Sequence, residues 1–340
     1  KSCVSAADID RDGDIDLFIG ILANATAYGI PQTSYLLLND GGKFSIAGSD
    51  IIKLDNIGMV TTAAFADMDK NGWPDLVIAG EWMPITVYKN INGTFTKSSI
   101  NQSSGQWQSI SISDVDGDGN PDILAGNWGL NNKFSGKKTG PINLYVADFD
   151  GNKRVDQLLS YTKNGEEYPF LAKDEVERAL PVLKKHYLLY ADYAGVPMKE
   201  VFYGYVDTVK PLTCEKLASV VCYSDGRGSY TMVDLPDQLQ RAPIFSFSYI
   251  ESNSNNRSFW LAGGNFYDVI PYEGRYDAQA LSMFQCSGRK VMLLADTNLL
   301  RFKGQVRDIK TVKTGSGKTL VAVAANNSPL VFFSLSNKTN

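Results

Sequence analysis

Short apolar segments that alternate with acidic turns recur along the first half of the chain. The segments SCVSAA, VTTAAFA, WQSISIS and INLYVA each lead into a loop rich in aspartate. Each loop is followed at once by LFIG, LVIAG, ILAG or QLLSY, which are rich in Val, Ile and Leu. Such runs on both sides of a polar turn are typical of β-strands, so each loop is predicted to be the turn of a β-hairpin.

A second type of hairpin recurs in YLLLNDGGKF, ITVYKNINGTF and SVVCYSDGRGSY. In each of these, a strand enters an Asn/Asp/Gly turn and resumes on an aromatic residue. One hairpin of each type makes a four-stranded antiparallel unit.

The acidic loops begin at Asp8, Asp67, Asp114 and Asp148, and similar units without long helices between them favour a radial arrangement. We therefore predict an all-β fold, a β-propeller of four-stranded antiparallel blades. Six to seven blades are expected, with seven favoured, and residues 1–340 are predicted to form this single domain. A two-sheet sandwich is the alternative, but it does not require the same loop to recur in each unit.

One segment departs from the strand pattern. Val176, Leu180 and Leu183 have helical spacing, Asp174 is a plausible N-cap, and Pro181 is expected to interrupt the helix. We predict a helical and irregular insertion within a blade over residues 171–217. Its simplest interpretation is a surface addition that covers an apolar edge.

Composition limits the classes of function. The chain has 340 residues of which 44% are hydrophobic, enough for a large core. No apolar run approaches the roughly 18–20 residues of a transmembrane helix, and the first residues do not resemble a signal peptide. Lys and Arg are dispersed and the formal net charge is −4, so nucleic-acid binding is not expected. His186 is the single histidine, which removes the commonest general base from most of the chain.

The four cysteines are irregularly spaced, which argues against a zinc site or a disulfide framework. Buried free thiols are favoured. The alternative is a Cys214–Cys222 bridge in an oxidising compartment.

The acidic loops share the pattern D-x-D-x-(D/N)-G-x-x-D. Oxygen ligands at positions 1, 3 and 5, glycine at 6 and a carbonyl at 7 are the requirements of a calcium-binding turn, and an aspartate at position 9 would complete the shell. The predicted ligands of the three regular loops are Asp8, Asp10, Asp12, Asp14 (carbonyl) and Asp16; Asp67, Asp69, Asn71, Trp73 (carbonyl) and Asp75; and Asp114, Asp116, Asp118, Asn120 (carbonyl) and Asp122. The fourth loop retains Asp148, Asp150, Asn152 and Asp156, but Lys153 replaces the glycine.

Three calcium sites are therefore predicted, and the fourth loop is a weaker candidate. An EF-hand is excluded because position 12 is apolar in all three regular loops, and magnesium rarely accepts an all-protein cage. The loops hold 15 of the 37 carboxylates, so three or four Ca²⁺ ions would offset the negative charge. Metal-free turns are the alternative, chiefly for the fourth loop.

The repeated loop, followed by an apolar strand and glycine, resembles the FG-GAP or VCBS repeat of integrin-α-type propellers. The segments GNFYDVIPYEGRYDA, YPFLAKDEVERALPVLKKHYLLYADYA and LPDQLQRAPIFSF further resemble the VCBS-repeat region of ASPIC/UnbV-type bacterial surface proteins. This resemblance implies a calcium-stabilised propeller, extracellular or associated with the bacterial cell surface or outer membrane. It also implies a role in adhesion, ligand binding or assembly, with a protein or glycan ligand or an outer-membrane protein complex as partner.

The second strands of the hairpins end on the face opposite the calcium loops, where aromatic and amide side chains recur. The candidate ligand-binding residues on this face are Glu81, Trp82, Asn127, Trp128, Asn265, Phe266, Tyr267 and Asp268. Aromatic residues with amides are typical of saccharide- or protein-binding surfaces. The alternative is that Trp82 and Trp128 pack between blades.

Two classes of function remain. We favour a noncatalytic binding or assembly module, because no catalytic constellation is recognisable. The alternative is a propeller-fold lyase or hydrolase that acts on an extracellular polysaccharide through Tyr267, Asp268, Arg275 or Tyr276.

Overall fold

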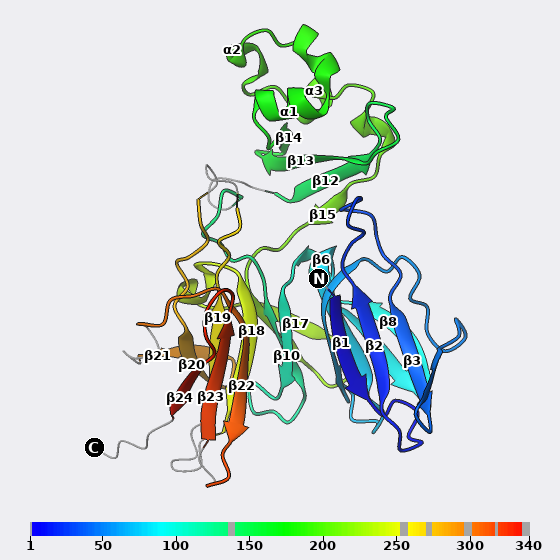
Figure 1. Cartoon of the computed structure of the whole chain (residues 1–340), viewed down its shortest axis with the longest axis vertical. Helices are drawn as coiled ribbons and strands as arrows, with labels where there is room; N and C mark the ends of the chain where they lie inside the picture. Colours follow the sequence, from blue (N-terminus) through cyan, green and yellow to red (C-terminus); the bar gives the residue numbers. More distant parts are fainter. Residues whose placement is uncertain are drawn as a thin grey trace.

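The computed structural model describes residues 2–134, 140–251, 258–269, 274–295, 301–316 and 319–334. Strands dominate it, and they form a series of antiparallel sheets that we call blades (Figure 1). Blade 1 consists of β1 (Ser2–Ala7), β2 (Asp16–Ile21), β3 (Tyr35–Asp40) and β4 (Lys43–Ile46). Blade 2 consists of β5 (Met59–Ala66), β6 (Asp75–Met83), β7 (Thr86–Ile91) and β8 (Thr94–Ser99), with the short β9 (Gly105–Gln106) paired to β6.

The third blade is built from two distant parts of the chain. It consists of β10 (Ser109–Ser113), β11 (Asp122–Gly126), β16 (Val220–Ser224) and β17 (Tyr230–Asp234). The 3₁₀ turn η3 (Asp237–Gln240) leads to blade 4, which contains β18 (Ile244–Ile250), β19 (Phe259–Gly264), β20 (Ser282–Ser287) and β21 (Lys290–Leu294). Blade 5 contains β22 (Val306–Lys313), β23 (Thr319–Ala325) and β24 (Val331–Ser334).

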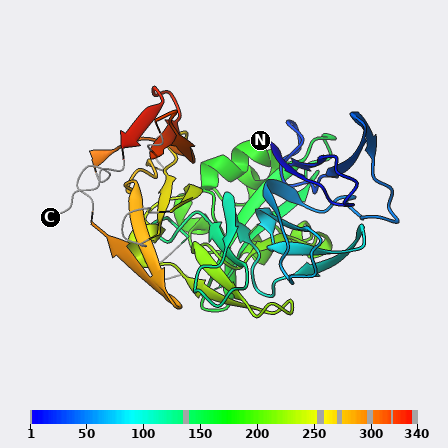
Figure 2. The same ribbon diagram turned by 90° about the horizontal axis from the view of Figure 1, so that it is seen from below.

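The blades follow one another in chain order along an arc (Figure 2). Their first strands, β1, β5, β10, β18 and β22, lie next to one another in succession. Hydroxyl groups at matching places on these strands join neighbouring blades. Thr61 Oγ1 donates to Trp107 O (2.7 Å), Ser109 Oγ donates to Ile244 O (3.0 Å), and Ser246 Oγ accepts from Ile309 N (3.1 Å).

Apolar clusters fill the spaces between successive blades. Phe18 and Leu36 pack with Val60 and Ile78 between blades 1 and 2, and the same arrangement repeats along the arc. The corresponding clusters include Val77, Trp107 and Ile123; Leu124, Phe247 and Trp260; and Leu261, Ile309 and Val321. The alternating burial of β2 follows from its alternating side chains, whereas β11 is buried throughout. The all-β prediction of four-stranded antiparallel blades is confirmed.

The insertion is longer than the predicted range 171–217. It separates β11 from β16 and contains a sheet of its own, formed by β12 (Ile142–Ala147), β13 (Asp156–Lys163), β14 (Glu166–Pro169) and β15 (Leu212–Cys214). The helical elements within it are α1 (Lys173–Ala179), η1 (Pro181–Lys185), α2 (Tyr190–Tyr193), α3 (Met198–Val201) and η2 (Val206–Thr208). The fourth acidic loop therefore lies in the insertion and not in a blade of the arc.

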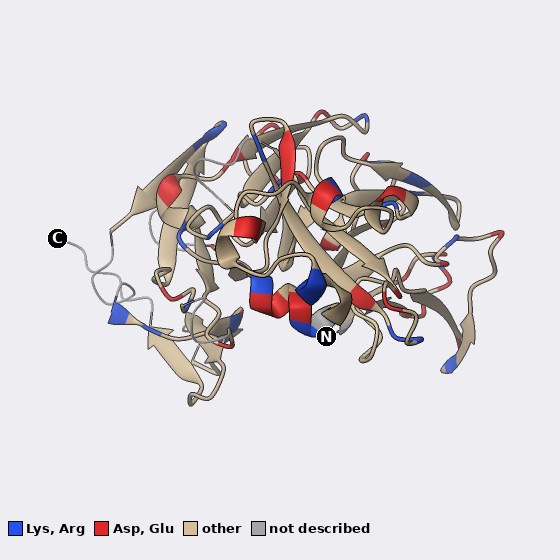
Figure 3. Ribbon diagram, turned by 90° about the horizontal axis from the view of Figure 1, so that it is seen from above, with Lys and Arg blue, Asp and Glu red and all other residues tan. Residues whose placement is uncertain are grey.

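The insertion has its own apolar core and lies against the blades. Leu158 of its sheet packs with Val176, Leu180 and Phe202 of the helical segment. The insertion lies at the end of the molecule opposite the β1–β2 turn (Figure 1). Seen from above, acidic and basic residues are interspersed on its helices (Figure 3).

The described residues form five blades in the arc and one inserted sheet, six antiparallel sheets in all. The prediction of six to seven blades counted the hairpin of the inserted sheet as a blade, so the arc itself has five blades in the described part of the chain. No helix in the described part of the chain is long and apolar enough to cross a membrane. The four cysteines are free, and burial raises the pKa of the Cys214 and Cys222 thiols to about 12.

Candidate metal centre

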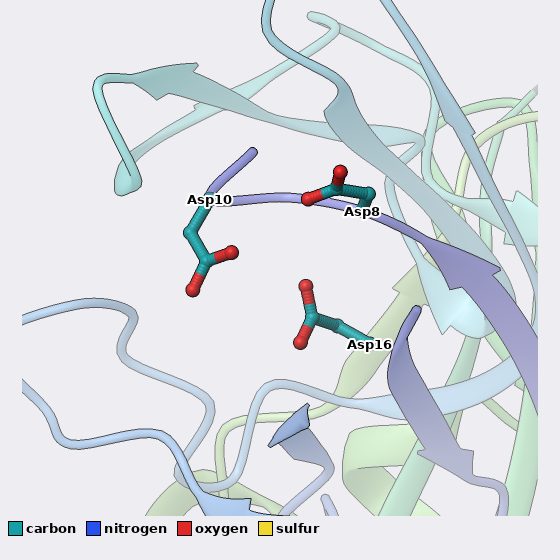
Figure 4. A group of neighbouring side chains, drawn as sticks. All are labelled: Asp8, Asp10 and Asp16. Atoms are coloured by element: carbon teal, nitrogen blue, oxygen red, sulfur yellow. The ribbon is translucent and has the colours of Figure 1, made fainter. Parts of the chain in front are cut away.

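Four hairpin turns each bring three aspartate carboxylates together. They are the turns between β1 and β2, β5 and β6, β10 and β11, and β12 and β13, which we call loops 1 to 4. The clustered residues are Asp8, Asp10 and Asp16; Asp67, Asp69 and Asp75; Asp114, Asp116 and Asp122; and Asp148, Asp150 and Asp156. In loop 1 the three carboxylates surround a common space (Figure 4).

The spacing of these oxygens fits a calcium ion. In each cluster one oxygen from each residue lies within 4.8 Å of the other two. Ligands that bind one Ca²⁺ at 2.3–2.6 Å are at most about 5 Å apart, so one ion could contact all three. The donors are all oxygen, which suits a hard cation and excludes the sulfur and imidazole ligands preferred by zinc.

The aspartate at position 9 closes each turn through backbone hydrogen bonds. One oxygen of Asp75 accepts from Met68 N (2.9 Å) and the other accepts from Asn90 N on β7 (2.6 Å). Asp16 and Asp122 repeat this pattern with the first residue inside the loop and with the third strand. All three of these carboxylates are buried. Asp156 accepts from Phe149 N (3.0 Å) and is more exposed.

Position 6 has the left-handed backbone conformation in every loop. Gly13, Gly72 and Gly119 have φ between 86° and 96°, and Lys153 has φ of 65°. In each loop this residue donates its N–H to the aspartate at position 1; for Lys153 the acceptor is Asp148 (2.8 Å). Loop 4 thus keeps the backbone of the other loops, although a lysine in this conformation costs roughly 1–2 kcal/mol.

The residues at positions 5 and 7 are linked by a hydrogen bond. Oδ1 of the position-5 side chain accepts from the position-7 N–H in all four loops, at 2.7–2.8 Å. The position-5 residues are Asp12, Asn71, Asp118 and Asn152, and the position-7 residues are Asp14, Trp73, Asn120 and Arg154. The Asp14 carboxylate also accepts from Gly41 N (2.7 Å) in the outer turn of the same blade. Its side chain is thus engaged away from the cluster, which leaves its carbonyl as the predicted ligand atom.

Four of the clustered carboxylates have raised pKa values because burial disfavours their charged forms. Burial raises the pKa of Asp75 to about 6, against the opposing effect of its two backbone hydrogen bonds. Burial also raises the pKa of Asp10, Asp122 and Asp156. The hydrogen bond from Asn120 N lowers the pKa of exposed Asp118. A cation within the cluster would reverse the cost of keeping these groups ionised.

Basic side chains contact the acidic loops, and one of them joins loop 1 to loop 2; the sequence did not predict these contacts. Arg11 of loop 1 donates to the Gly72 carbonyl of loop 2, and its guanidinium lies 4.5 Å from the centre of the Trp73 ring. Lys89 pairs with Asp69. Arg289 of blade 4 donates to Asp116 at 3.1 Å. The one feature of the sequence that could have predicted these contacts is the basic residue at position 4 of loops 1 and 2.

Two of the predicted ligand-binding residues have structural roles instead. Asn127 is fully buried; its Nδ2 donates to Lys216 O (2.9 Å) and its Oδ1 accepts from Trp128 N (2.8 Å). Asn265 is 2% exposed, and its side chain bonds both N and O of Gln279. These amides tie chain segments together, which corrects the prediction that they contact a ligand.

Glu81 and Trp82 meet a tyrosine that the sequence did not single out. The Tyr28 hydroxyl, in the β2–β3 connection, donates to Glu81 Oε2 (2.7 Å) and accepts from Trp82 Nε1 (2.9 Å). The Tyr28 carbonyl accepts from Gln157 of the insertion (3.2 Å). This network joins blades 1 and 2 to the inserted sheet.

Two of the remaining candidates, Trp128 and Phe266, belong to an aromatic cluster near the start of blade 4. Trp128 packs edge-on against Phe266 and Tyr276, with ring centres 5.6 and 5.1 Å apart. The Arg275 guanidinium lies 5.3 Å from the Tyr267 ring centre. Asp268 is exposed and interacts electrostatically with Arg307, whose pKa is lowered by burial. Trp128 therefore packs between segments, as the alternative interpretation holds.

Comparison with known sequences identifies the repeat. The profile of the FG-GAP-like repeat matches residues 8–78 and 67–125, which include loops 1 to 3. Residues 8–125 therefore match FG-GAP-like repeats, which confirms the resemblance inferred from loops 1 to 3. No curated protein sequence matches the chain significantly.

Solved structures resemble the chain only distantly. The biofilm matrix protein Bap1 of V. cholerae is 12% identical, with a TM-score of 0.33, and the match covers 98% of this chain and 77% of Bap1. The endo-arabinase of Bacteroides thetaiotaomicron is 10% identical, with a TM-score of 0.32, and the match covers 99% of this chain and 94% of the enzyme. Neither likeness carries weight for function.

Proposed function

We propose that this chain is a calcium-stabilised, noncatalytic binding module that acts outside the cell, at a cell surface. The observation that carries the proposal is the repeated loop. Four turns, one of them outside the arc of blades, use the same backbone hydrogen bonds to gather three carboxylates. Three carboxylates held this close repel one another, and a bound cation would offset that cost.

The proposed calcium sites also fit the proposed location. Extracellular calcium modules work with dissociation constants of about 10⁻⁴–10⁻³ M, a range suited to the abundant calcium outside cells. We propose a protein or glycan ligand, or an outer-membrane protein complex, as the partner. Because Asn127 and Asn265 are engaged in structural bonds, we propose that exposed side chains such as Asp268 carry the recognition.

Equilibrium dialysis with calcium tests the first part of the proposal. We expect three ions per chain with similar affinity and a fourth that binds more weakly, because Lys153 adds a positive charge to loop 4. Asp67→Asn should remove one ion from the count, whereas Asp55→Asn, on an exposed residue outside the loops, should leave it unchanged. Dialysis that retains no calcium would contradict the proposal.

Polysaccharide turnover is the alternative, and it depends on Tyr267, Asp268, Arg275 and Tyr276. The contact between Arg275 and the Tyr267 ring is the feature that favours it. Incubation with extracellular polysaccharides, followed by a reducing-end and an unsaturated-sugar assay, distinguishes the two functions. A binding module releases no product, and product that disappears in Tyr267→Phe would establish the enzyme.

A further inference from the structure

One buried asparagine bonds to the metal loops of two different blades. The backbone N–H of Asn90, on β7, donates to Asp75 of loop 2 (2.6 Å). Its side-chain Nδ2 donates to the carbonyl of Ile9 in loop 1 (2.9 Å) and to Pro74 O (3.1 Å). Asn90 is fully buried, so these bonds are shielded from water.

The loop 1 end of this connection leads directly to its carboxylates. Ile9 lies between Asp8 and Asp10, and its own N–H donates to Asp16 (2.9 Å). Ile9 is also fully buried in the apolar cluster between blades 1 and 2. A shift of the Asp75 carboxylate would therefore move Asn90, and Asn90 would move the Ile9 backbone between the loop 1 ligands Asp8 and Asp10.

Arg11 makes a second connection at the surface. Its guanidinium donates a hydrogen bond to the carbonyl of Gly72, at position 6 of loop 2. The guanidinium also stacks on the ring of the next residue, Trp73. Arg11 N–H in turn donates to Asp8 (2.7 Å). Loop 1 thus contacts loop 2 directly through Arg11 and indirectly through Asn90 of β7.

The equivalent residues of the other blades lack the cross-blade bond. Asn39 of blade 1 donates its N–H to Asp16 (2.8 Å), but its side chain bonds Ile15 O (3.1 Å) in its own blade. In blade 3 the position is Ser224, whose N–H donates to Asp122 (2.8 Å) and whose hydroxyl accepts from Gly226 N. Among the described residues, a buried side chain that bonds to two loops is therefore particular to loops 1 and 2, whereas loops 2 and 3 meet at the surface, where the Lys70 ammonium lies beside Gly119 and Asp118.

We propose that Asn90 and Arg11 are positioning residues that couple calcium binding at loops 1 and 2, so that an ion in one loop strengthens binding in the other. The inference rests on the proposed calcium function. Coupling between two sites of this kind changes affinity by about fivefold or more and acts equally in both directions.

Calorimetric titration tests the coupling in the full chain, with loops 3 and 4 disabled by Asp114→Asn and Asp148→Asn. Loop 1 alone is measured in a further Asp67→Asn variant, and loop 2 alone in a further Asp10→Asn variant. With both loops intact, the second calcium should bind at least about fivefold more tightly than the single-loop affinities predict.

Asn90→Ser and Asn39→Ser form a matched pair. Serine occupies the same position in blade 3, and either variant keeps the backbone N–H that bonds the position-9 aspartate. Asn90→Ser should reduce the coupling to less than about twofold, and Asn39→Ser should leave it intact. Arg11→Ala, at an exposed site, should weaken the coupling, and Arg11→Lys should restore part of it.

Additive binding of the two loops in the otherwise unchanged sequence, or full coupling in Asn90→Ser, would overturn the inference. Either result would leave calcium binding itself in place. Absence of any calcium binding to the single-loop variants and to the full chain would instead contradict the proposed function.

Discussion

Substitution of Asp75 separates the two roles of a position-9 aspartate. Its two oxygens bond the N–H groups of Met68 and Asn90, and its side chain is 1% exposed. Asp75→Ala would leave two buried donors without these bonds, at about 1–3 kcal/mol each, so we expect a loss of about 2–6 kcal/mol in the free energy of unfolding. Asp75→Asn keeps one acceptor and should lose about half as much.

The contribution of Asp75 to metal binding appears as an additional loss of unfolding free energy when calcium is present. A ligand present at 100 times its dissociation constant stabilises the folded state by about 2.7 kcal/mol per site, and both variants should forfeit this at loop 2. Denaturant unfolding, monitored by intrinsic fluorescence, gives the hydrogen-bond contribution in excess chelator and the additional calcium contribution in excess calcium. Asp156→Ala is the matched control, because the Phe149 N–H donates to it at 3.0 Å and it is more exposed.

Two results would refute this reasoning. A loss below about 1 kcal/mol for Asp75→Ala in chelator would show that the buried hydrogen bonds contribute little. Equal stabilisation by calcium in Asp75→Ala and in the unsubstituted chain would show that Asp75 does not help to hold an ion.

Three further predictions concern loop 4, pH and backbone packing. Lys153→Gly should tighten calcium binding at loop 4 in calorimetry, because it removes a positive charge and the strained conformation; unchanged affinity would contradict this. In metal-free protein the stability that comes from the raised pKa of Asp75 is present at low pH and is lost as pH rises through about 6. The denaturation midpoint should therefore fall between about pH 4 and pH 6 in chelator and level off above that range, and this trend should shrink in Asp75→Asn. Gly264→Ala would place a Cβ 1.7 Å from the Pro243 carbonyl and should lower the melting temperature sharply, whereas Gly315→Ala, with open space around it, should not.

The local structure could be predicted from sequence because it depends on neighbouring residues. The loop of Asp67 to Asp75 contains its own turn glycine, its ligands and the start of the following strand, and the structure has these elements where they were expected. The outer hairpin around Gly226 was likewise recognised, although its blade was not.

The insertion could not be delimited from sequence because its strands resemble those of the blades. The segment from Ile142 to Asp156 carries the same hairpin and the same acidic loop, so its sequence predicts another blade. Only the pairing of Ala125 with Val220, across the whole insertion, reveals which strands belong together. Pairing over such a separation leaves no local signal.

The candidate ligand residues show a similar limit. Asn127 and Asn265 follow strands at matching positions, which suggested a shared binding face. At the same position the chain leaves a blade, and a buried amide there hydrogen-bonds to backbone groups of neighbouring segments. Spacing alone does not distinguish an amide that binds a ligand from one that holds a turn. Similarly, Tyr28 lies in an irregular connection and was not expected to reach Glu81.

Thermal unfolding in calcium and in chelator tests the central claim most directly. Three occupied loops at about 2.7 kcal/mol each would contribute about 8 kcal/mol, a large part of the stability of a domain. We expect scanning calorimetry to show a melting temperature more than about 10 °C higher in excess calcium than in excess EGTA, with magnesium unable to replace calcium. An unchanged melting temperature in chelator would contradict the account.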